Sequence, residues 1–403
     1  MLALAWRNVQ RHLGRNATML AAVVFGVVGL IVTGGFVQDI FVQLGEALIH
    51  SQTGHLQVLP KGYYDAGTRS PERYRIDAPA PVTREIAAIP GVADVMTRVA
   101  FSGLLNNGRS DWSITGEGVE PDKEARLGSF VRTLAGRPLA DTDHSGISIG
   151  QGVAQALKLA PGDRATLVVN TAEGALNSVD VEVVGVFESF SRDYDAHAVR
   201  IPIAAAQELL VSGGINSIVI ALDSTAATQA VAAQLRSGPL TKNLDVKTWQ
   251  ELNDFYEKTV SLYERQFGVL QLIILVMVVL SVANSVNMNV FERIGEFGTM
   301  MALGNRRRSI ALLVLAECTI LGIIGGALGV VLGIGLAHAI SSIGIPMPPP
   351  PNANLGYTAL VRVVPAIVAA AFAVGALATV LAGILPALKV SRSPIVDALR
   401  TGY

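Results

Sequence analysis

A serine flanked by glycines is the first residue in this sequence whose surroundings could support catalysis. Gly146, Ser148 and Gly150 form the G-x-S-x-G pattern of a nucleophile elbow, in which a strand turns into a helix. An acid, Asp163, and a histidine, His197, follow in the chain order that such hydrolases use. A hydrolase elbow also needs a parallel sheet between helices, whereas the strands here look mostly antiparallel. We therefore interpret the motif as a strand entering a helix, and a membrane-bound serine hydrolase stays the enzyme alternative.

The other reactive side chains form no recognisable catalytic or metal constellation. His50 and His55 flank a glycine-containing turn and lack the spacing of a helical metal pair, so we interpret them as interfacial residues. Cys318 is the single cysteine, which excludes an intrachain disulfide and a cysteine-based metal cluster. No G-x-x-x-x-G-K-[ST] occurs, so these residues hold no P-loop for ATP. We expect no catalytic residue, metal or cofactor on this chain.

The composition indicates a membrane protein. Hydrophobic residues make up 51% of the chain and charged residues only 16%, whereas soluble domains carry about 25% charged residues. The formal net charge is −1, and no basic face with interleaved aromatic residues is present. A nucleic-acid partner is therefore not expected.

Four apolar runs approach or exceed the roughly 20 residues that a membrane-spanning helix needs. They are Ala17–Ile40, Phe267–Val290, Ile310–Ile340 and Val363–Leu385. The first run is longer than the apolar part of a typical signal peptide, and no clear cleavage site follows it. We expect an uncleaved first helix.

Basic residues beside the spans predict the orientation. They precede the first span, lie between the second and third, and follow the fourth: Arg7, Arg11, Arg15, Arg293, Arg306, Arg307, Arg308, Lys389, Arg392 and Arg400. The loop from Ser341 to Val361 has no Lys or Arg. Both termini should therefore be cytoplasmic, in the inner membrane of a bacterium, with the long segment after the first span in the periplasm.

The long segment between the first two spans has a different texture. Short alternating stretches such as HLQVL, WSITGEGV, VDVEVVGVF and NSIVIAL predict strands, and VTREIAAI, QGVAQALKL, PIAAAQELL and ATQAVAAQLR predict helices. The predicted fold class is a membrane α-helical protein with four transmembrane helices and a large α+β periplasmic domain between helices 1 and 2.

Apolar residues recur at helical spacing where the first two spans leave the membrane. The two stripes are Val37, Phe41, Leu44 and Leu48, and Phe255, Leu262 and Val269 with Tyr256, Tyr263 and Leu270. They predict a stalk in which the two helices pack together. The same surface could form an apolar pocket, for which the candidate lining residues are Val37, Phe41, Leu44, Phe267 and Leu270.

The third span contains glycines and an acid. Gly322, Gly325, Gly326, Gly329 and Gly333 form small-xxx-small pairs, which allow helices to approach closely. Glu317 lies in the same span, where a carboxylate is costly and usually paired. We favour a hydrogen-bonded structural role for Glu317 over a proton relay.

The segment between the second and third spans carries more than a connection requires. Helical character is expected from Phe291 to Leu303, with Glu292 and Glu296 one turn apart. The arginines 306–308 are explained as a positive-inside anchor. The acids and small residues before them are not, and they indicate a docking element for a soluble partner.

Four stretches carry a family resemblance. ERIGEFGTMMALG resembles the coupling helix of MacB/LolC/LolE-type ABC transporter permeases, which use mechanotransmission. LAWRNVQRHLGR resembles the family's cytoplasmic amphipathic helix, GILPALKVSRSPIVDALR its terminus, and ISIGQGVAQALKLAPGDRATLVV with VEVVGVF the middle of its periplasmic domain. The resemblance covers essentially the whole chain, and TGHLQVLPKGYYD looks more like LolC/LolE-type relatives than MacB.

The resemblance implies a transport subunit rather than an enzyme. ATP and magnesium would be bound by a separate ABC ATPase subunit in two copies, and the permease would pair with a second copy or a homologue. The coupling segment carried over consists of Glu292, Arg293, Glu296, Gly298, Ala302, Leu303 and Gly304. The family often has basic residues where this chain has Gly295 and Met301, so we expect fewer charge contacts with the ATPase.

The resemblance leaves three functions open. The first is extraction or release of a lipidated substrate such as a lipoprotein, for which an apolar pocket facing membrane lipids would suit acyl chains. The second is MacB-like efflux of a drug, peptide or toxin with a periplasmic adaptor. The third is FtsX-like regulation of a cell-wall hydrolase, although the outer domain of such proteins is typically much smaller.

The predicted organisation follows from these spans. The segments are 1–16 cytoplasmic amphipathic helix, 17–45 transmembrane helix 1 and stalk, 46–250 periplasmic domain, 251–290 stalk and transmembrane helix 2, 291–308 coupling helix, 309–343 transmembrane helix 3, 344–361 periplasmic loop, 362–386 transmembrane helix 4 and 387–403 cytoplasmic tail.

Overall fold

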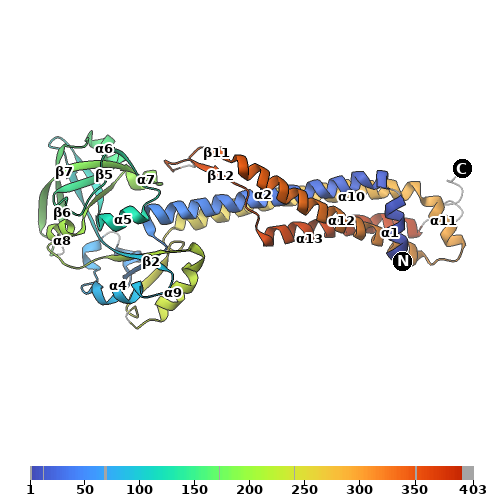
Figure 1. The fold of residues 1–403 in the computed structure, drawn as a ribbon, viewed down its shortest axis with the longest axis horizontal. Helices are drawn as coiled ribbons and strands as arrows, with labels where there is room; N and C mark the ends of the chain where they lie inside the picture. Colours follow the sequence, from blue (N-terminus) through green and yellow to red (C-terminus); the bar gives the residue numbers. More distant parts are fainter. Residues whose placement is uncertain are drawn as a thin grey trace. The chain divides into compact units, whose positions relative to one another are not determined.

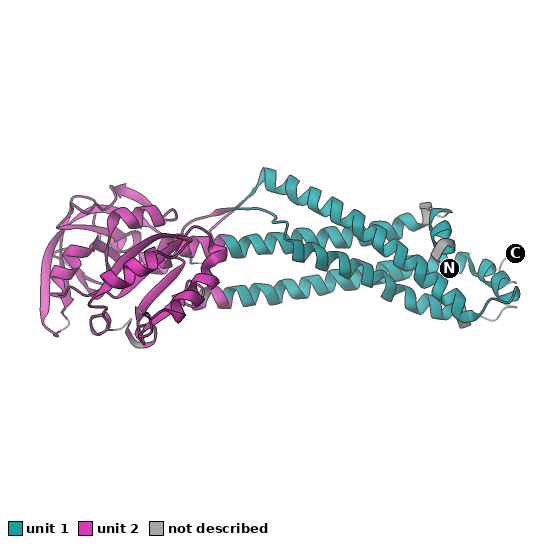
Figure 2. Ribbon diagram, turned by 60° about the horizontal axis from the view of Figure 1, so that its bottom comes forward, with its two compact units in different colours: residues 1–42, 259–346, 358–403 teal, residues 43–258, 347–357 magenta. Residues whose placement is uncertain are grey.

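The structure is a computed structural model that describes residues 2–11, 13–67, 70–171, 173–239, 241–349 and 352–392. The chain divides into two compact units, coloured separately in Figure 2. The helical unit comprises Met1–Val42, Thr259–Pro346 and Thr358–Tyr403, and the sheet unit comprises Gln43–Lys258 and Met347–Tyr357. Arg400 and the rest of the predicted tail beyond residue 392 lie outside the described residues.

Long helices dominate the helical unit. Its helices are α1 (Leu2–Arg11), α2 (Leu13–Leu48), α10 (Asp254–Glu292), α11 (Ile294–Ala302), α12 (Arg307–Ile343) and α13 (Pro365–Arg392). Four helical stretches among the described residues are long and apolar enough to cross a membrane: Asn16–Thr53, Tyr256–Glu292, Arg307–Ile343 and Pro365–Val390. Each overlaps one of the four apolar runs of the sequence. Helices α2 and α10 each have one end in the sheet unit.

The glycines of α12 allow its two neighbours to approach closely. A Cβ added at Gly325, Gly329 or Gly333 would lie 2.7–3.1 Å from side-chain atoms of α2 (Val23, Val27 and Ile31). A Cβ at Gly322 or Gly326 would instead meet α13, at Thr379 and Phe372. The predicted small-residue packing is thus present on two sides of one helix.

Helix α10 is packed less closely than the others. Within its most apolar window only 11% of residues are buried, compared with 44% for the first span. Leu262 and Val269 are 56% and 58% exposed, so the predicted stripe through these residues does not pack on α2. Tyr263 of the adjacent stripe does contact α2, because its ring lies 6.5 Å from that of Phe41, whereas Leu270 is 47% exposed. The stalk contact predicted through Leu262 and Val269 is therefore wrong, because α10 turns its Tyr263 side toward α2.

The sheet unit contains a ten-stranded mixed sheet with helices packed against it (Figure 1). Its strands are β1 (Leu56–Pro60), β2 (Val92–Asn106), β3 (Asp111–Val119), β4 (Arg132–Gly136), β5 (Gly146–Gly150), β6 (Arg164–Asn170), β7 (Leu176–Glu188), β8 (Ala198–Pro202), β9 (Ser217–Leu222) and β10 (Leu244–Thr248). Its helices and helical turns are η1 (Ile49–Thr53), α3 (Tyr63–Ala66), η3 (Pro71–Arg73), α4 (Pro79–Ala87), α5 (Pro121–Leu127), α6 (Gln151–Leu157), α7 (Arg192–Asp195), α8 (Ile203–Leu209), η4 (Thr225–Ala227) and α9 (Thr228–Ser237). A separate two-stranded sheet pairs β11 (Ile345–Met347) with β12 (Tyr357–Ala359).

The long strand β2 connects the two halves of this sheet. From Val92 to Arg98 it pairs with β9, and from Val99 to Asn106 it pairs with β3. Strand order runs β10-β1-β9-β2-β3-β8-β5-β7-β4, and β6 pairs with β2 and β7. The pairs β3–β8 and β5–β7 are parallel and the others are antiparallel. The predicted strands are present, but β4, β8 and β10 are additional.

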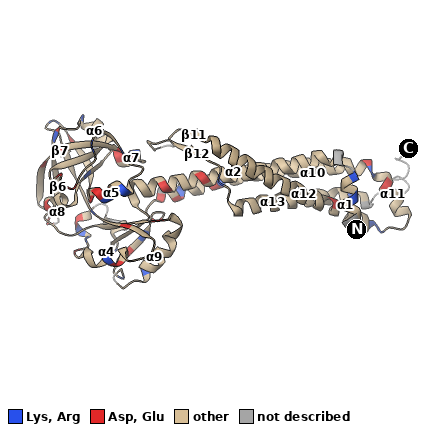
Figure 3. Cartoon of the chain, in the orientation of Figure 1, with Lys and Arg blue, Asp and Glu red and all other residues tan. Residues whose placement is uncertain are grey.

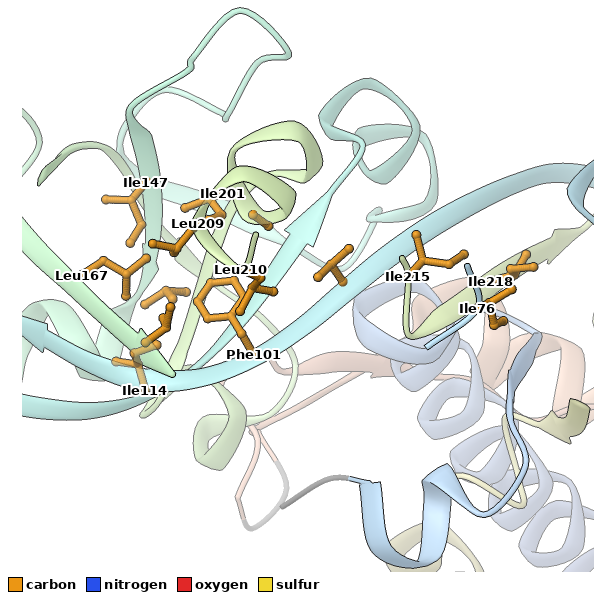
Figure 4. Packing of buried hydrophobic residues seen from close by; sticks show 14 of the residues in the cluster. Ile76, Phe101, Ile114, Ile147, Leu167, Ile201, Leu209, Leu210, Ile215 and Ile218 are labelled. Carbon is orange, nitrogen blue, oxygen red and sulfur yellow. The ribbon is translucent and has the colours of Figure 1, made fainter. Parts of the chain in front are cut away.

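Buried aliphatic and aromatic side chains form the core of the sheet unit (Figure 4). Phe101 on β2 is 2% exposed and lies among residues such as Ile147, Leu167 and Leu210. A Cβ at Gly116 would lie 1.9 Å from the Phe101 ring, so only glycine fits beside it on β3. Burial of this apolar area supplies the main free energy that holds the strands together.

Candidate functional site

The coupling segment is a short helix bounded by two breaks. Helix α10 ends at Glu292, and Arg293 leaves the helical conformation (φ −104°, ψ 14°) before α11 begins. Helix α11 ends before Gly304, whose φ of +94° favours glycine. The predicted helical character from Phe291 to Leu303 is present up to Ala302, with one interruption where the chain turns at Arg293.

Arg293 is buried at this turn and binds the acid of the third span. Its side chain donates from Nη1 to Oε2 of Glu317 at 2.7 Å and from Nη2 to Oε1 at 3.3 Å. This two-bond geometry is the strong form of an arginine–carboxylate pair. Asn8 of α1 donates to Glu317 Oε1 at 2.7 Å. One carboxylate of α12 thus joins α1 and the α10–α11 turn.

The contacts of Arg293 keep it charged although it is only 5% exposed. Burial by itself lowers the pKa of Arg293, but the hydrogen bond and charge of Glu317 outweigh this effect and raise it above the ordinary value. Glu296 accepts a further bond from Arg293 Nε at 3.1 Å, and the Phe297 ring lies 5.0 Å from the guanidinium carbon. Both oxygens of Glu317 have donors, which favours the hydrogen-bonded role over a proton relay.

A second polar contact lies in the same unit. Asn16 on α2 donates to the carbonyl of Val9 at 3.2 Å and accepts from Asn289 of α10 at 3.0 Å. With the Arg293–Glu317–Asn8 contacts, these bonds join α1, α2, α10 and α12. The turn that precedes α11 is thus connected to these helices by side-chain hydrogen bonds.

Helix α11 has one packed face and one open face. Phe297, Gly298 and Met301 are buried, whereas Leu303 is 80% exposed and the Glu296 side chain 57% exposed. Ala302, Gly304 and the arginines 306–308 are exposed as well. Charged residues are frequent around α1 and α11 and rare along α12 and α13 (Figure 3). The open face therefore combines an acid, small residues and the neighbouring arginines.

The candidate pocket residues do not form one group. Val37 and Phe41 are buried on α2, and Phe41 is linked to Phe267 through Tyr263, whose ring stacks on Phe267 at 6.2 Å. Leu270 is 47% exposed. Leu44 belongs to the sheet unit, where it packs on a cluster with Leu48. The structure thus links Phe41 and Phe267 through Tyr263 in an aromatic row.

Asp39 is an acid within the first candidate membrane span, and sequence reasoning missed it. It lies on α2 with no exposed side-chain area, and it accepts bonds from the Leu360 amide and from Arg362 Nε, both at 2.8 Å. These bonds hold α2 to the chain that enters α13. The same signal that pointed to Glu317 could have found Asp39, because Asp39 is an acid inside the first apolar run.

The serine motif does not form a catalytic triad. Ser148 is 8% exposed within β5, and its hydroxyl lies 3.5 Å from the carbonyl of Gly185. Asp163 accepts a bond from the Ala160 amide, and His197 bonds the carbonyl of Ser113. Within the described residues these three side chains make no hydrogen bonds to one another. Ser148 is a strand residue that precedes helix α6, as the sequence predicted.

Of the two histidines, His55 is not interfacial as predicted, because it is buried in the sheet unit. His55 is 2% exposed, and its Nδ1 accepts a bond from the Leu222 amide at 3.1 Å. Burial, assisted by the charge of His50, lowers the pKa of His55 to about 4. His50 lies beside it, with its Nε2 at 3.3 Å from a carboxylate oxygen of Glu46. In the described part of the chain no group of three or more potential ligands could hold a metal.

Comparison with domain families gives two matches that together cover most of the chain. A family described as the MacB-like periplasmic core domain matches residues 17–237. A family described as the FtsX-like permease C-terminal region matches residues 268–395. The first match ends before α10, and the second contains α11, α12 and all of α13.

Similar proteins include one that is longer than this chain and one that this chain matches over almost its full length. A macrolide export ATP-binding/permease protein MacB of Rhodospirillum rubrum is 28% identical over 428 residues, covering 99% of this chain and 60% of that protein. The chain thus spans about 60% of the length of that relative. YvrN of Bacillus subtilis (strain 168), an uncharacterized ABC transporter permease, is 25% identical, with 99% and 98% covered.

Similar solved structures are domains of related proteins. The periplasmic region of MacB from Actinobacillus actinomycetemcomitans has a TM-score of 0.36 and 15% identity, covering 50% of this chain and 92% of that one. The extracellular domain of the ABC-type transporter YknZ has a TM-score of 0.35 and 16% identity, covering 48% and 99%.

Proposed function

Because this chain belongs to the MacB/FtsX family of ABC transporter permeases, we propose that it couples a separate ABC ATPase to work on a lipidated substrate outside the membrane. Two ATPase copies bind below the membrane, and a second permease, a copy or a homologue, completes the transporter. ATP binding closes the ATPase pair and displaces α11. The sheet unit then extracts or releases a lipoprotein on the periplasmic side.

The buried Arg293 is the observation that carries the coupling step. Its bonds to Glu317 and the contact of Asn8 with the same carboxylate tie the segment beside α11 to α12 and α1. Helix α11 exposes one face, and the residue before it is held by a buried ion pair. A force applied to α11 can therefore reach α12 through Arg293. The relative YvrN, matched over 98% of its length, supports a permease that works with an ATPase on another chain.

The charge distribution supports the orientation. Arg7, Arg11, the arginines 306–308 and Lys389 are exposed and flank the α11 side of the spans. No Lys or Arg occurs from Ser341 to Val361. By the positive-inside rule, α1 and α11 are cytoplasmic, and the sheet unit is periplasmic, in the inner membrane.

The aromatic row supports a lipidated cargo. Phe41, Tyr263 and Phe267 line neighbouring positions of α2 and α10, and α10 exposes apolar side chains that membrane lipids can contact. An acyl chain that leaves the membrane loses about 0.8 kcal/mol of favourable burial free energy for each CH₂ exposed to water. Apolar side chains of this row could cover these CH₂ groups. Phe41→Asp or Phe267→Asp should therefore weaken transport of a lipidated cargo more than that of a polar drug.

The matched control for this test is Leu262→Asp. Leu262 neighbours Tyr263 on α10 but is 56% exposed. It should affect the two cargo classes equally. Equal effects of the Phe41 and Phe267 changes on both cargo classes would reject the acyl-chain proposal.

Efflux of a drug, peptide or toxin is the second candidate function. The observation that favours it is the similarity over almost the whole chain to a protein named for macrolide export. Regulation of a cell-wall hydrolase, as in FtsX, is the third, and the FtsX-like match to residues 268–395 is compatible with it.

Purification of the native complex distinguishes these functions. The chain is isolated gently with an ATPase whose hydrolysis is blocked, and the retained proteins are identified by mass spectrometry. An ATPase together with a lipid-modified protein is the expected result. An ATPase with an adaptor and an outer-membrane duct would support efflux instead, a cell-wall hydrolase would support regulation, and the absence of any ATPase would overturn the proposal.

A further inference from the structure

The first long helix ends inside the sheet unit, where its backbone is capped by side chains. After Leu48 it continues as the π-helical turn η1, which Gly54 (φ +64°) terminates. The last carbonyl groups of a helix have no partners within it. Here they accept bonds from the sheet unit: Ile49 from the Gly54 amide, Ser51 from Arg200, Gln52 from Arg98 and Thr53 from Gln57.

Two of these donors are buried arginines. Arg98 on β2 is 5% exposed and Arg200 on β8 is 8% exposed. Positive charge at a helix C-terminus also interacts favourably with the helix dipole. The pair therefore holds the helix end both by hydrogen bonds and by charge.

Two glutamates neutralise these arginines. Glu124 accepts from Arg98 Nε at 2.5 Å and from Nη2 at 2.8 Å. Glu117 lies between the arginines, 3.9 Å from Arg98 and 3.4 Å from Arg200. Burial by itself raises the pKa of Glu117, but the two guanidinium groups outweigh it, so this pKa lies below the ordinary value. The hydroxyl of Tyr194 donates to Glu117 at 2.7 Å.

The arginines lie where the two halves of the sheet meet. Arg98 is the last residue of β2 that pairs with β9, and the next residue, Val99, pairs with β3. Arg200 pairs with Glu117 in the parallel β3–β8 ladder. The helix end is thus attached to both halves at their junction.

We propose that Arg98, Arg200, Glu117 and Glu124, here called the helix-end clamp, are positioning residues that make the whole sheet unit move with the end of α2. This inference rests on the proposed function, in which displacement of α11 leads to work by the sheet unit, and it assigns the first span the transfer of that motion. The clamp acts through the backbone of η1 and touches no substrate. Its attachment at the junction prevents the two halves from moving separately.

Distance measurements between spin labels within the sheet unit test the clamp. One label is placed at Gln43 of α2, and the other at Ala233 of α9 or Gln155 of α6. Both of these partner positions are exposed. The background is Cys318→Ala, and the full chain is studied in lipid nanodiscs with pulsed electron resonance.

The intact clamp should give a narrow distance distribution for both label pairs. Arg98→Gln with Arg200→Gln should broaden both by several ångström. Arg126→Gln is the matched control. Arg126 lies on α5, like Glu124 of the clamp, but its ion pair is with Asp94 at the surface. This control should leave both distributions narrow. Broad distributions with the intact clamp would overturn the proposal, even where the double variant fails to fold.

A second readout separates positioning from folding. In complexes with the ATPase, the double variant should retain ATP hydrolysis and lose ATP-driven release of cargo. Unchanged release together with narrow distances in the double variant would also overturn the clamp. The distance measurement needs no ATPase, so it remains valid if the proposed transport function fails. Narrow distance distributions for the intact clamp, without any ATPase recovered in the purification, would reject the transport function alone.

Discussion

Two buried arginine clusters, one in each unit, stabilise different kinds of partner. In the helical unit, Arg293 binds the side chain of Glu317, which also binds Asn8. In the sheet unit, Arg98 and Arg200 bind backbone carbonyls of Gln52 and Ser51 as well as glutamates. In the first cluster both members of the ion pair, Arg293 and Glu317, are side chains, so both can be replaced by apolar residues at once. The second satisfies backbone groups that remain whatever the side chains are.

This difference predicts how each cluster tolerates replacement. A buried ion pair can often be exchanged for apolar residues at little cost, because both charges leave together. A buried carbonyl that loses its donor keeps its desolvation penalty. The helical cluster should therefore be replaceable for stability, and the sheet cluster should not.

Removal of Arg293 alone should have the largest effect. Arg293→Met leaves Glu317 as an unpaired, 9% exposed carboxylate, which should cost about 3–5 kcal/mol. The double change Arg293→Met with Glu317→Leu should recover most of this loss without restoring coupling. Thermal loss of monodisperse protein in detergent measures both, with the exposed Arg306→Met as control. A double variant as unstable as Arg293→Met would contradict the comparison.

The equivalent double change in the sheet unit should not recover stability. Arg98→Met with Glu124→Leu removes one ion pair but leaves the carbonyl of Gln52 without its donor and Glu117 with one arginine fewer. The expected cost is about 2–3 kcal/mol. Thermal unfolding followed by the fluorescence of Trp112 and Trp249, both in the sheet unit, measures it. A stability equal to that of the unmodified chain would show that the two clusters are equivalent.

Acid should weaken the sheet unit near the helix end. His55, next to the Gly54 cap, has a pKa lowered to about 4 in the folded chain, whereas an unfolded chain takes up this proton near the ordinary value of about 6.5. Unfolding therefore binds a proton between these two values, and stability falls as the pH is lowered through this window, by about 2 kcal/mol. Tryptophan fluorescence during thermal unfolding, recorded from pH 7 to pH 4, measures it. His55→Gln should remove this part of the pH dependence, and an unchanged slope would contradict the assignment.

Loss of Asn8 should have the smallest effect. Asn8→Ala removes one hydrogen bond to Glu317, whose contacts with Arg293 remain. The expected cost is about 1 kcal/mol. A loss as large as that of Arg293→Met would mean that Asn8, and not Arg293, holds the carboxylate.

The sequence predicted elements better than partners. Apolar length identified the four long helices, alternation identified most strands, and the glycine spacing of α12 predicted its close packing. Arg293 and Glu317 were each singled out, but their pairing was not, because 24 residues and a turn separate them. Strand β4 was missed because all its residues are exposed, and β8 because all five of its residues are buried, so neither has the alternation of a half-buried strand.

The helix-end clamp could not be found from the sequence. Its charged residues lie on β2, β3, α5 and β8, and charged side chains in short strands ordinarily face solvent. Only the order of the strands brings Arg98 and Arg200 to one helix end. Asp39, by contrast, was detectable, because an acid inside an apolar span is costly wherever it occurs.

Site-specific photocrosslinking tests the central claim, that α11 is the element that an ATPase drives. A photoreactive amino acid is placed at Leu303, which follows α11 and is 80% exposed, or at Ile343, which ends α12 and is 86% exposed. Crosslinking is performed in native membranes, and the products are identified by mass spectrometry. An ABC ATPase should be captured at Leu303 and none at Ile343. No ATPase at Leu303, or equal capture at both positions, would contradict it.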